Sequence, residues 1–480
     1  MATALRLTCV LSLAACGLAA QNPAPEAMAP LLIRLHAAVL DSDGKPVTDL
    51  TAGDFKITDQ GKPQTISFSR RDGVEAASAT GPHEFTNRPG GTLPHSTAIL
   101  FDLLNESQTD RLDVWHQLDR SLPQIESGAS VYMYLLSLEG ALTPIRAVDD
   151  KSIGGQTWTQ QSAKLLDKAM KSTSHARPVG MIDEEAVKKT YVALETIGNQ
   201  LGTLPGRRDI IWITSSMPNA WNTKLPCNGD WVDCALYVPH LAVTLDRTGT
   251  VVNPLSYTNN PNPGVTRDIE QMALLTGGHA YFREDIAAVV KQVERDAANG
   301  YTIFYDPGAD NFDNKWHKVR VNLERKGSRL HVRQRFYALP DSRAPQARLQ
   351  AAMVSAYQGF RDVPDIGLRA KMSPAADQKG VHLEVRINPA DLSLHESGAY
   401  FDGSATFLLG DFGASSPLGE PAVNTFSLHL TREQHDAVMK DGVPMEQDHA
   451  LAAGVQKLKV IVLDNSTTTV GSLTIPVGGQ

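Results

Sequence analysis

Hydrophobic and polar residues alternate in the first part of the chain that follows residue 30. The alternating segments are residues 31–40, 54–59 and 65–69, and turns rich in Gly, Asp and Pro separate them. A period of two is typical of half-buried strands, so this part predicts a small β unit. Residues 71–96 are rich in Gly, Pro, Ser and Thr and show no period, which predicts a loop or linker.

From residue 97 the chain changes to continuous apolar runs separated by amphipathic segments. A continuous run is typical of a strand buried on both faces, and apolar positions three and four apart indicate a helix. The predicted strands cover residues 97–101, 131–138, 142–148, 209–214, 241–245 and 279–282. The predicted helices cover residues 108–122, 183–203, 266–276 and 284–298. Strands that alternate with helices predict a mostly parallel, doubly wound sheet.

After residue 300 this alternation stops. Strands of β type are predicted at residues 301–305, 316–323 and 329–337, and the Ala- and Gln-rich residues 341–358 predict a connecting helix. Five more strands are predicted at residues 381–387, 400–409, 423–430, 456–463 and 470–477. Their spacing is typical of a β-sandwich.

Composition narrows the class of protein. At about 150 residues per domain, 480 residues predict about three domains. With 42% hydrophobic and 20% charged residues the chain can bury real cores. The net charge of −8 argues against general nucleic-acid binding, which needs a basic surface. No apolar run approaches the roughly 20 residues of a membrane span, and four cysteines are too few for a disulfide-dense scaffold.

The N-terminus predicts export. Arg6 precedes an apolar and small-residue stretch at residues 7–18, as in a signal peptide of residues 1–20 with a linker at residues 21–30. Two cleavage sites compete. One lies after Ala20, and the other is a lipobox-like Leu-Ala-Ala-Cys in which Cys16 would become the lipidated first residue; otherwise Cys16 is only a small apolar residue of the signal. The predicted location is periplasmic, outer-membrane-anchored or secreted, with membrane contact only through the signal or one lipid anchor.

Two cysteines remain in the predicted mature chain. Cys227 and Cys234 lie close in sequence, and in an exported protein such a pair favours a local loop-closing disulfide over a metal site. Trp221 and Trp231 lie in the same segment. They either project from a rim loop, where aromatic residues favour partner binding, or pack down over the loop.

Several motifs occur together in a family-specific order. They are LTAGDFKI at residues 50–57, DQGKP at 59–63, GRRDIIWIT at 206–214, LAVTLD at 241–246, MALLTGG at 272–278, GYTIFY at 300–305 and VRQRFY at 332–337. Over roughly residues 31–340 the chain resembles the von Willebrand factor A-related proteins abundant in Acidobacteria. The resemblance implies a Rossmann-like A domain flanked by β elements.

The patterns and the resemblance together predict the domain organisation. Neither residues 31–75 nor residues 300–340 hold enough strands for a stable core, so we predict that they pair into one β-sandwich. The A domain, residues 95–299, would be inserted into that sandwich. A helical connector at residues 341–375 and a C-terminal immunoglobulin-like β-sandwich at residues 376–480 would follow. The predicted fold class is therefore α/β and β, in several domains.

A divalent-cation site is a further implication of the resemblance. A domains hold the cation with an Asp-x-Ser-x-Ser motif after the first strand and with residues of later loops, because Mg²⁺ prefers hard oxygen ligands. Asp102 matches the first position of this motif, but Leu104 and Glu106 stand where the serines belong. Ser215 follows the fourth predicted strand, and Asp246 the fifth.

A weak, degenerate site for Mg²⁺ or Mn²⁺ would thus use Asp102, Glu106, Ser215 and Asp246, with Asn105 and Ser107 beside them. The other interpretation is that Asp102 caps the following helix or accepts from loop amides. The loss of an oxygen ligand at Leu104 favours that second interpretation, which requires no cofactor.

No nucleophile elbow, P-loop or zinc-protease motif is present in the sequence, so we expect no enzyme. The leading hypothesis is an exported binding or adhesion module. Its contact surface would be the carboxyl-end rim of the A domain, which includes Asn105, Ser107, Trp221 and Trp231, and its partners would be proteins in the envelope or outside the cell. The alternative is a structural scaffold of the cell envelope with a degenerate, metal-free A domain.

Overall fold

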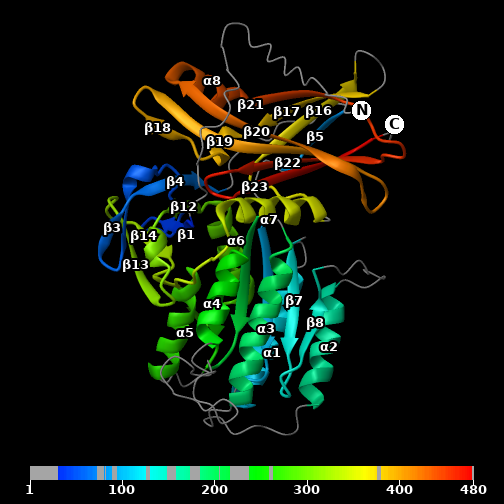
Figure 1. Cartoon of the computed structure of the whole chain (residues 1–480). Helices are drawn as coiled ribbons and strands as arrows, with labels where there is room; N and C mark the ends of the chain where they lie inside the picture. The colour runs from blue at the N-terminus through cyan, green and yellow to red at the C-terminus, as the bar shows by residue number, and fades with distance from the viewer. Residues whose placement is uncertain are drawn as a thin grey trace.

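The computed structural model describes residues 31–72, 81, 83–88, 95–106, 108–125, 130–148, 158–172, 184–204, 206–216, 237–258, 263–359, 361–375 and 380–477. These residues form two β-sandwiches and one α/β unit (Figure 1). None of the described helices is long and apolar enough to cross a membrane.

The first sandwich combines strands from two distant parts of the chain. Its first sheet has the order β14 (Arg329–Val332), β1 (Ile33–Leu40), β12 (Tyr301–Tyr305) and β4 (Ile66–Arg71). Its second sheet has the order β15 (Arg335–Tyr337), β13 (Trp316–Leu323), β2 (Phe55–Asp59) and β3 (Lys62–Gln64). Leu35 lies opposite Ile303, and Ile57 lies opposite Val321, so each sheet contains strands from both sides of the α/β unit. The α/β unit is therefore an insertion in this sandwich.

The α/β unit contains a six-stranded sheet. Its order is β11 (Tyr281–Phe282), β10 (Thr250–Ser256), β9 (Arg207–Ile213), β6 (His95–Asp102), β7 (Val131–Leu136) and β8 (Leu142–Arg146). All neighbouring strands are parallel except β8, which runs antiparallel to β7. Because both faces of a parallel sheet must be covered, the central residues of β6, β7 and β9 are buried apolar runs, as predicted.

Helices cover both faces of this sheet. One face packs against α3 (Glu184–Leu201), α4 (Tyr237–Arg247) and α5 (Pro263–Thr276). The other face packs against α1 (Gln108–Ile125), α2 (Trp158–Ser172) and α6 (Ile286–Ala298). The chain first runs outward from β6 to β8 and then returns to β9 beside β6, so the strand order reverses between β6 and β9.

The strand predicted at residues 241–245 is wrong, because these residues belong to α4. The buried positions Val238, Leu241, Ala242 and Leu245 have helical spacing, which the short apolar run hid. The strand that follows β9 in the sheet is β10, whose interior carries Asn253 and Pro254. Neither residue type is expected within a central strand, so its pattern was not recognised.

The second sandwich extends beyond the predicted C-terminal range. Its first sheet has the order β21 (Val443–His449), β17 (Val381–Ile387), β16 (Leu368–Pro374) and β5 (Glu84–Thr86). Its second sheet contains β18 (His395–Ser397), β19 (Tyr400–Phe412), β22 (Lys457–Asp464) and β23 (Val470–Pro476), and β20 (Pro417–Thr431) pairs with β19. The helices α7 (Pro345–Gln358) and α8 (Arg432–Asp441) accompany it.

Two predictions about this region are therefore corrected. The loop predicted at residues 71–96 contains β5, which pairs with β16 in the second sandwich. The helical connector predicted at residues 341–375 contains α7 but also β16. β5 has only three residues, which is too short to show a period, and its pairing partner β16 lies far away in the sequence.

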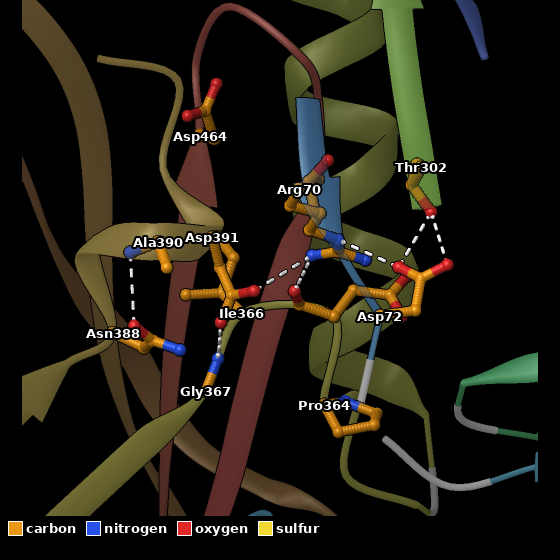
Figure 2. A network of polar contacts seen from close by, with 12 residues as sticks. Arg70, Asp72, Thr302, Pro364, Ile366, Gly367, Asn388, Ala390, Asp391 and Asp464 are labelled. Carbon is orange, nitrogen blue, oxygen red and sulfur yellow. Dashed lines mark hydrogen bonds and ion pairs between the residues drawn. The ribbon is translucent and has the colours of Figure 1, made fainter. Parts of the chain in front are cut away.

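A buried polar network joins the two sandwiches (Figure 2). The Asp391 carboxylate accepts from Gly367 N at 2.9 Å and lies 3.3 Å from Arg70 Nη1. Arg88, two residues after the end of β5, places its Nη2 2.8 Å from the same carboxylate. On the other side, Asp72 lies 3.5 Å from Arg70 Nε and accepts from the Thr302 hydroxyl. The network therefore ties β4 and β12 of the first sandwich to the second sandwich.

The amino ends of the parallel strands face the first sandwich. Arg333, after β14, forms an ion pair with Asp246 near the end of α4, and Gln334 N donates to Leu274 O. The carboxyl ends of β6 and β9 lie at the opposite end of the α/β unit, away from both sandwiches (Figure 1).

The turn from α5 to β11 depends on a glycine. A Cβ atom on Gly278 would lie 2.1 Å from the carbonyl oxygen of Val252 in β10. We therefore expect Gly278→Ala to lower the free energy of unfolding by about 2 kcal/mol, as measured by thermal unfolding. Gly53→Ala is the control, because the nearest atom there would be 3.7 Å away. Equal stability of the two variants would contradict this close approach.

Candidate functional site

The reversal of strand order places two loops side by side at the carboxyl end of the sheet. Open α/β sheets bind ligands in the crevice at such a position. Asp102 ends β6 and is followed by Asn105 and Glu106, while Ser215 and Ser216 follow β9. The Ser216 hydroxyl donates to Asn105 O at 2.9 Å, so the two loops are in direct contact. We call the residues Asp102, Asn105, Glu106, Ser215 and Ser216 the rim.

Hydrogen bonds from its surroundings occupy Asp102. Its Oδ1 accepts from Asn105 N at 3.1 Å, and its Oδ2 accepts from Asn105 Nδ2 at 2.7 Å and from Trp212 Nε1 at 2.9 Å. Asn105 Nδ2 also donates to Thr190 Oγ1 of α3. Burial raises the pKa of Asp102 to about 6, although the bonds from Asn105 and Trp212 lower it. Asp102 therefore holds the loop after β6 against the sheet and α3.

Glu106 is a buried carboxyl group with one partner on the other loop. The Ser215 hydroxyl donates to Glu106 Oε2 and lies 3.3 Å from Asp110 Oδ2. Burial raises the pKa of Glu106 to about 8. The hydrogen bond from Ser215 lowers this pKa, whereas the nearby charges of Asp102 and Asp110 raise it. Glu106 is therefore mainly protonated at neutral pH.

The rim does not fit a divalent cation. Both oxygens of Asp102 accept from N–H groups, and Leu104 supplies no oxygen. Mg²⁺ instead needs ionised or carbonyl oxygens that are free to ligate it. In the described part of the chain, no group of three or more His, Cys, Asp or Glu side chains is arranged to hold a metal ion.

The structure separates Asp246 from the other predicted ligands. Asp246 lies near the end of α4, and its Oδ1 accepts from Arg333 Nη1 at 2.6 Å at the amino end of the sheet. The prediction that it joins Asp102 depended on the wrong strand at residues 241–245. Asp102, Asn105, Glu106 and Ser215 do come together at the rim.

Several predicted features lie outside the described residues. They are the signal peptide at 1–20 with Cys16, the linker at 21–30, Ser107, Trp221, Trp231 and the Cys227–Cys234 pair.

Sequence reasoning missed four side chains that shape the rim. They are Asp110, Arg111, Thr190 and Trp212. Asp110 lies four residues after Glu106, which lies just before α1, so this short spacing was a usable signal. Trp212 lies within an apolar run, and nothing in its local pattern shows that its indole N–H reaches Asp102.

Comparisons with known proteins do not assign a family. No protein-family model matches the chain, and no curated protein matches it significantly. Among solved structures, the PilB minor pilin from Streptococcus sanguinis is 10% identical with a TM-score of 0.28, over 43% of this chain and 63% of the pilin. This chain thus covers less than two thirds of that pilin.

Two other solved structures show comparably distant similarity. A von Willebrand factor type A protein from Catenulispora acidiphila is 10% identical with a TM-score of 0.28, over 64% of this chain and 80% of that one. The human COPII-coat protein Sec24c is 12% identical with a TM-score of 0.24, over 82% and 45%. Similarity at this level carries no functional argument. By its own sheets, the chain is a mixed α/β and β-rich multi-sheet protein.

Proposed function

We propose that this protein is an exported, non-enzymatic binding or adhesion module that contacts a protein partner through the rim of its α/β unit. The observation that carries the proposal is the position of the rim. It lies at the switch in strand order between β6 and β9, at the end of the molecule farthest from both sandwiches (Figure 1). A partner can reach this end without displacing either sandwich.

Strand order supports the assignment of the α/β unit to the von Willebrand factor A type. Numbered along the chain, its strands have the order 3-2-1-4-5-6 with an antiparallel third strand, the doubly wound arrangement that the sequence resemblance implies. We assign the C-terminal unit to the immunoglobulin-like sandwiches, because two antiparallel sheets enclose one core. Fold alone does not fix function, so the rim carries the argument.

Metal-independent contact follows from the rim chemistry. Asn105 and Ser216 are only half-buried at this edge, while both oxygens of the neighbouring Asp102 already accept hydrogen bonds. Such an edge favours hydrogen bonds with a protein surface over a bridging cation.

Blocking the rim tests the proposal. Ser216→Lys places a long charged side chain at the contact, so we expect capture of envelope proteins by the immobilised protein to fall about tenfold. Capture is quantified by mass spectrometry of the eluted proteins. Ser415→Lys, in an exposed turn of the second sandwich, is the matched control and should capture as much as the unmodified chain.

Two outcomes would contradict parts of this proposal. Equal capture by Ser216→Lys and by the control would exclude the rim and favour the scaffold alternative, in which the sandwiches make the contacts. Loss of capture when EDTA is added would contradict metal independence.

A further inference from the structure

Two histidine rings are stacked across the contact between the α/β unit and the first sandwich. His279 lies between α5 and β11, and His331 belongs to β14. Their ring centroids are 4.7 Å apart and their planes differ by 10°. Tyr281 of β11 meets the His279 ring edge-on, also at 4.7 Å. Each of the two units therefore contributes one titratable ring to a single, half-buried stack.

The backbone is closely packed beside this stack. Gln334 N, after β14, donates to Leu274 O of α5 at 3.0 Å, so this hydrogen bond crosses the same contact. A Cβ atom on Gly277 would lie 2.9 Å from Arg333 N. The two units cannot move apart here without separating the histidine rings and breaking the Gln334 hydrogen bond.

The charges that face the stack are mainly positive. Arg329 of β14 and Arg207 of β9 act on His331, and Arg329 also acts on His279. Glu284, after β11, is the carboxylate that acts on His279. A proton on either ring thus adds a positive charge to a contact that already holds two guanidinium groups.

Other titratable groups of this contact lie farther along it. Asp209 lies 3.2 Å from Arg207 Nε, and Asp296 of α6 also acts on Arg207. His36 of β1 lies 4.0 Å from Asp72. Burial holds the pKa of His36 well below 6.5, and the charges of four arginines lower it further: Arg34, Arg207, Arg70 and Arg333. His36 is therefore a second neutral histidine of this contact, and the experiment must separate it from the stack.

We propose that the His279–His331 stack is a pH-sensitive switch that holds the α/β unit against the first sandwich at neutral pH and lets this contact open in acid. Two protonated imidazoles at this separation repel each other, and the neighbouring Arg329 and Arg207 add to the repulsion. Opening of the contact separates the charges and lets water solvate them. The α/β unit is then free to turn relative to its support.

The direction of the pH effect follows from the closed and open arrangements. In the closed arrangement, burial lowers the pKa of His331 from 6.5 to about 4, and the charges of His279, Arg329 and Arg207 contribute to this shift. Burial also lowers the pKa of His279. In the open arrangement both histidines return toward their ordinary pKa. The closed arrangement is therefore fully favoured above pH 6.5 and loses stability as the pH falls through about 4.

Hydrogen exchange of the full chain at about pH 7.5 and about pH 5 tests the switch. The Gln334 amide reports on opening, because its hydrogen bond crosses the contact. After correction for intrinsic exchange, protection of a peptide covering 330–336 should fall about twentyfold at the lower pH, since uptake of one proton changes the opening equilibrium by up to tenfold per pH unit. Peptides of β6 and β9 should not lose protection, which distinguishes opening from global unfolding.

Variants of the stack assign the effect to its rings. His331→Phe keeps an aromatic ring that cannot take up a proton, so its protection should be equal at the two pH values. His331→Arg carries a permanent charge and should lose protection already at about pH 7.5. His116→Gln, which changes an exposed histidine of α1, is the control and should respond to pH like the unmodified chain.

Three results would overturn the proposal. They are full protection of residues 330–336 at about pH 5, an equal loss of protection in β6 and β9, and a pH response of His331→Phe as large as that of the control. The last result would assign the response to His36 or to another group. If His331→Phe does not fold, His279→Phe removes the titratable ring on the other side and decides in the same way. The switch does not depend on the proposed function, because capture through the rim is measured at neutral pH, where the contact is closed.

Discussion

Replacing Glu106 by Gln is expected to stabilise the α/β unit at about pH 8 and to remove most of the pH dependence of its stability above about pH 6. Burial raises the pKa of Glu106 from 4.5 to about 8 in the folded chain. Folding therefore favours the protonated carboxyl group. This contribution to the free energy of unfolding is complete below pH 4.5 and is lost as the pH rises through about 8.

The expected loss of stability at high pH is large because the Glu106 carboxyl group ionises while it is buried, without a cation bonded to it. The shift corresponds to about 5 kcal/mol across the window. Gln cannot ionise, and its amide retains a hydrogen-bonding group for Ser215, so Glu106→Gln should avoid this loss. Asp102, with its pKa raised from 3.8 to about 6, contributes in the same direction but at lower pH. The range from about pH 6 to pH 8 therefore isolates Glu106.

Native-state hydrogen exchange in β6 and β9 measures this effect apart from the sandwiches. After correction for intrinsic exchange, the opening free energy of the unmodified chain should fall across this range, while that of Glu106→Gln should stay nearly level. Glu420→Gln, at an exposed position of β20, should behave like the unmodified chain. A level profile in the unmodified chain would show that Glu106 is ionised throughout.

Much of the fold could be predicted because burial leaves a local pattern. β7 and the central residues of β6 and β9 form continuous apolar runs, and that is the pattern a parallel strand under two helix layers requires. β10 escaped this reasoning because its interior Asn253 makes hydrogen bonds that only the folded sheet supplies. It donates to Asp209 Oδ1 at 2.8 Å and accepts from His279 N at 3.0 Å.

The candidate site, too, could be predicted only as far as local sequence patterns reach. Asp102, Glu106 and Ser215 could be predicted to meet, because each follows a strand that ends at the same edge of the sheet. The unpaired donors of Arg111 could not be predicted, since an arginine on a helix is ordinarily solvated and only tertiary packing buries it. The sequence therefore predicted where the rim lies. The hydrogen bonds of its residues and the unpaired donors of Arg111 are seen only in the structure.

The contact between the two sandwiches could not be predicted from the sequence either. Removing one charge from this contact should lower the free energy of unfolding strongly. Asp391→Asn preserves the side-chain shape but removes the negative charge that faces the buried Arg88 and Arg70. Asp72 stays beside Arg70 (Figure 2). Breaking a buried ion pair in this way costs about 3–5 kcal/mol, because both arginine charges stay buried with one carboxylate fewer to balance them. We expect this loss in urea unfolding, together with faster hydrogen exchange in β5 and at residues 366–368.

The comparison with an exposed ion pair tests whether burial is the cause. Glu396 pairs with Arg432 on the surface of the second sandwich, and both side chains are more than half exposed. Solvent screens such a pair, so Glu396→Gln should cost less than about 1 kcal/mol and leave exchange in β5 unchanged. If Asp391→Asn were as mild as Glu396→Gln, the sandwiches would be joined by apolar packing alone. A large loss confined to β5 and its neighbours would instead show that the buried charges hold the two sandwiches together and keep the rim at the far end of a rigid support.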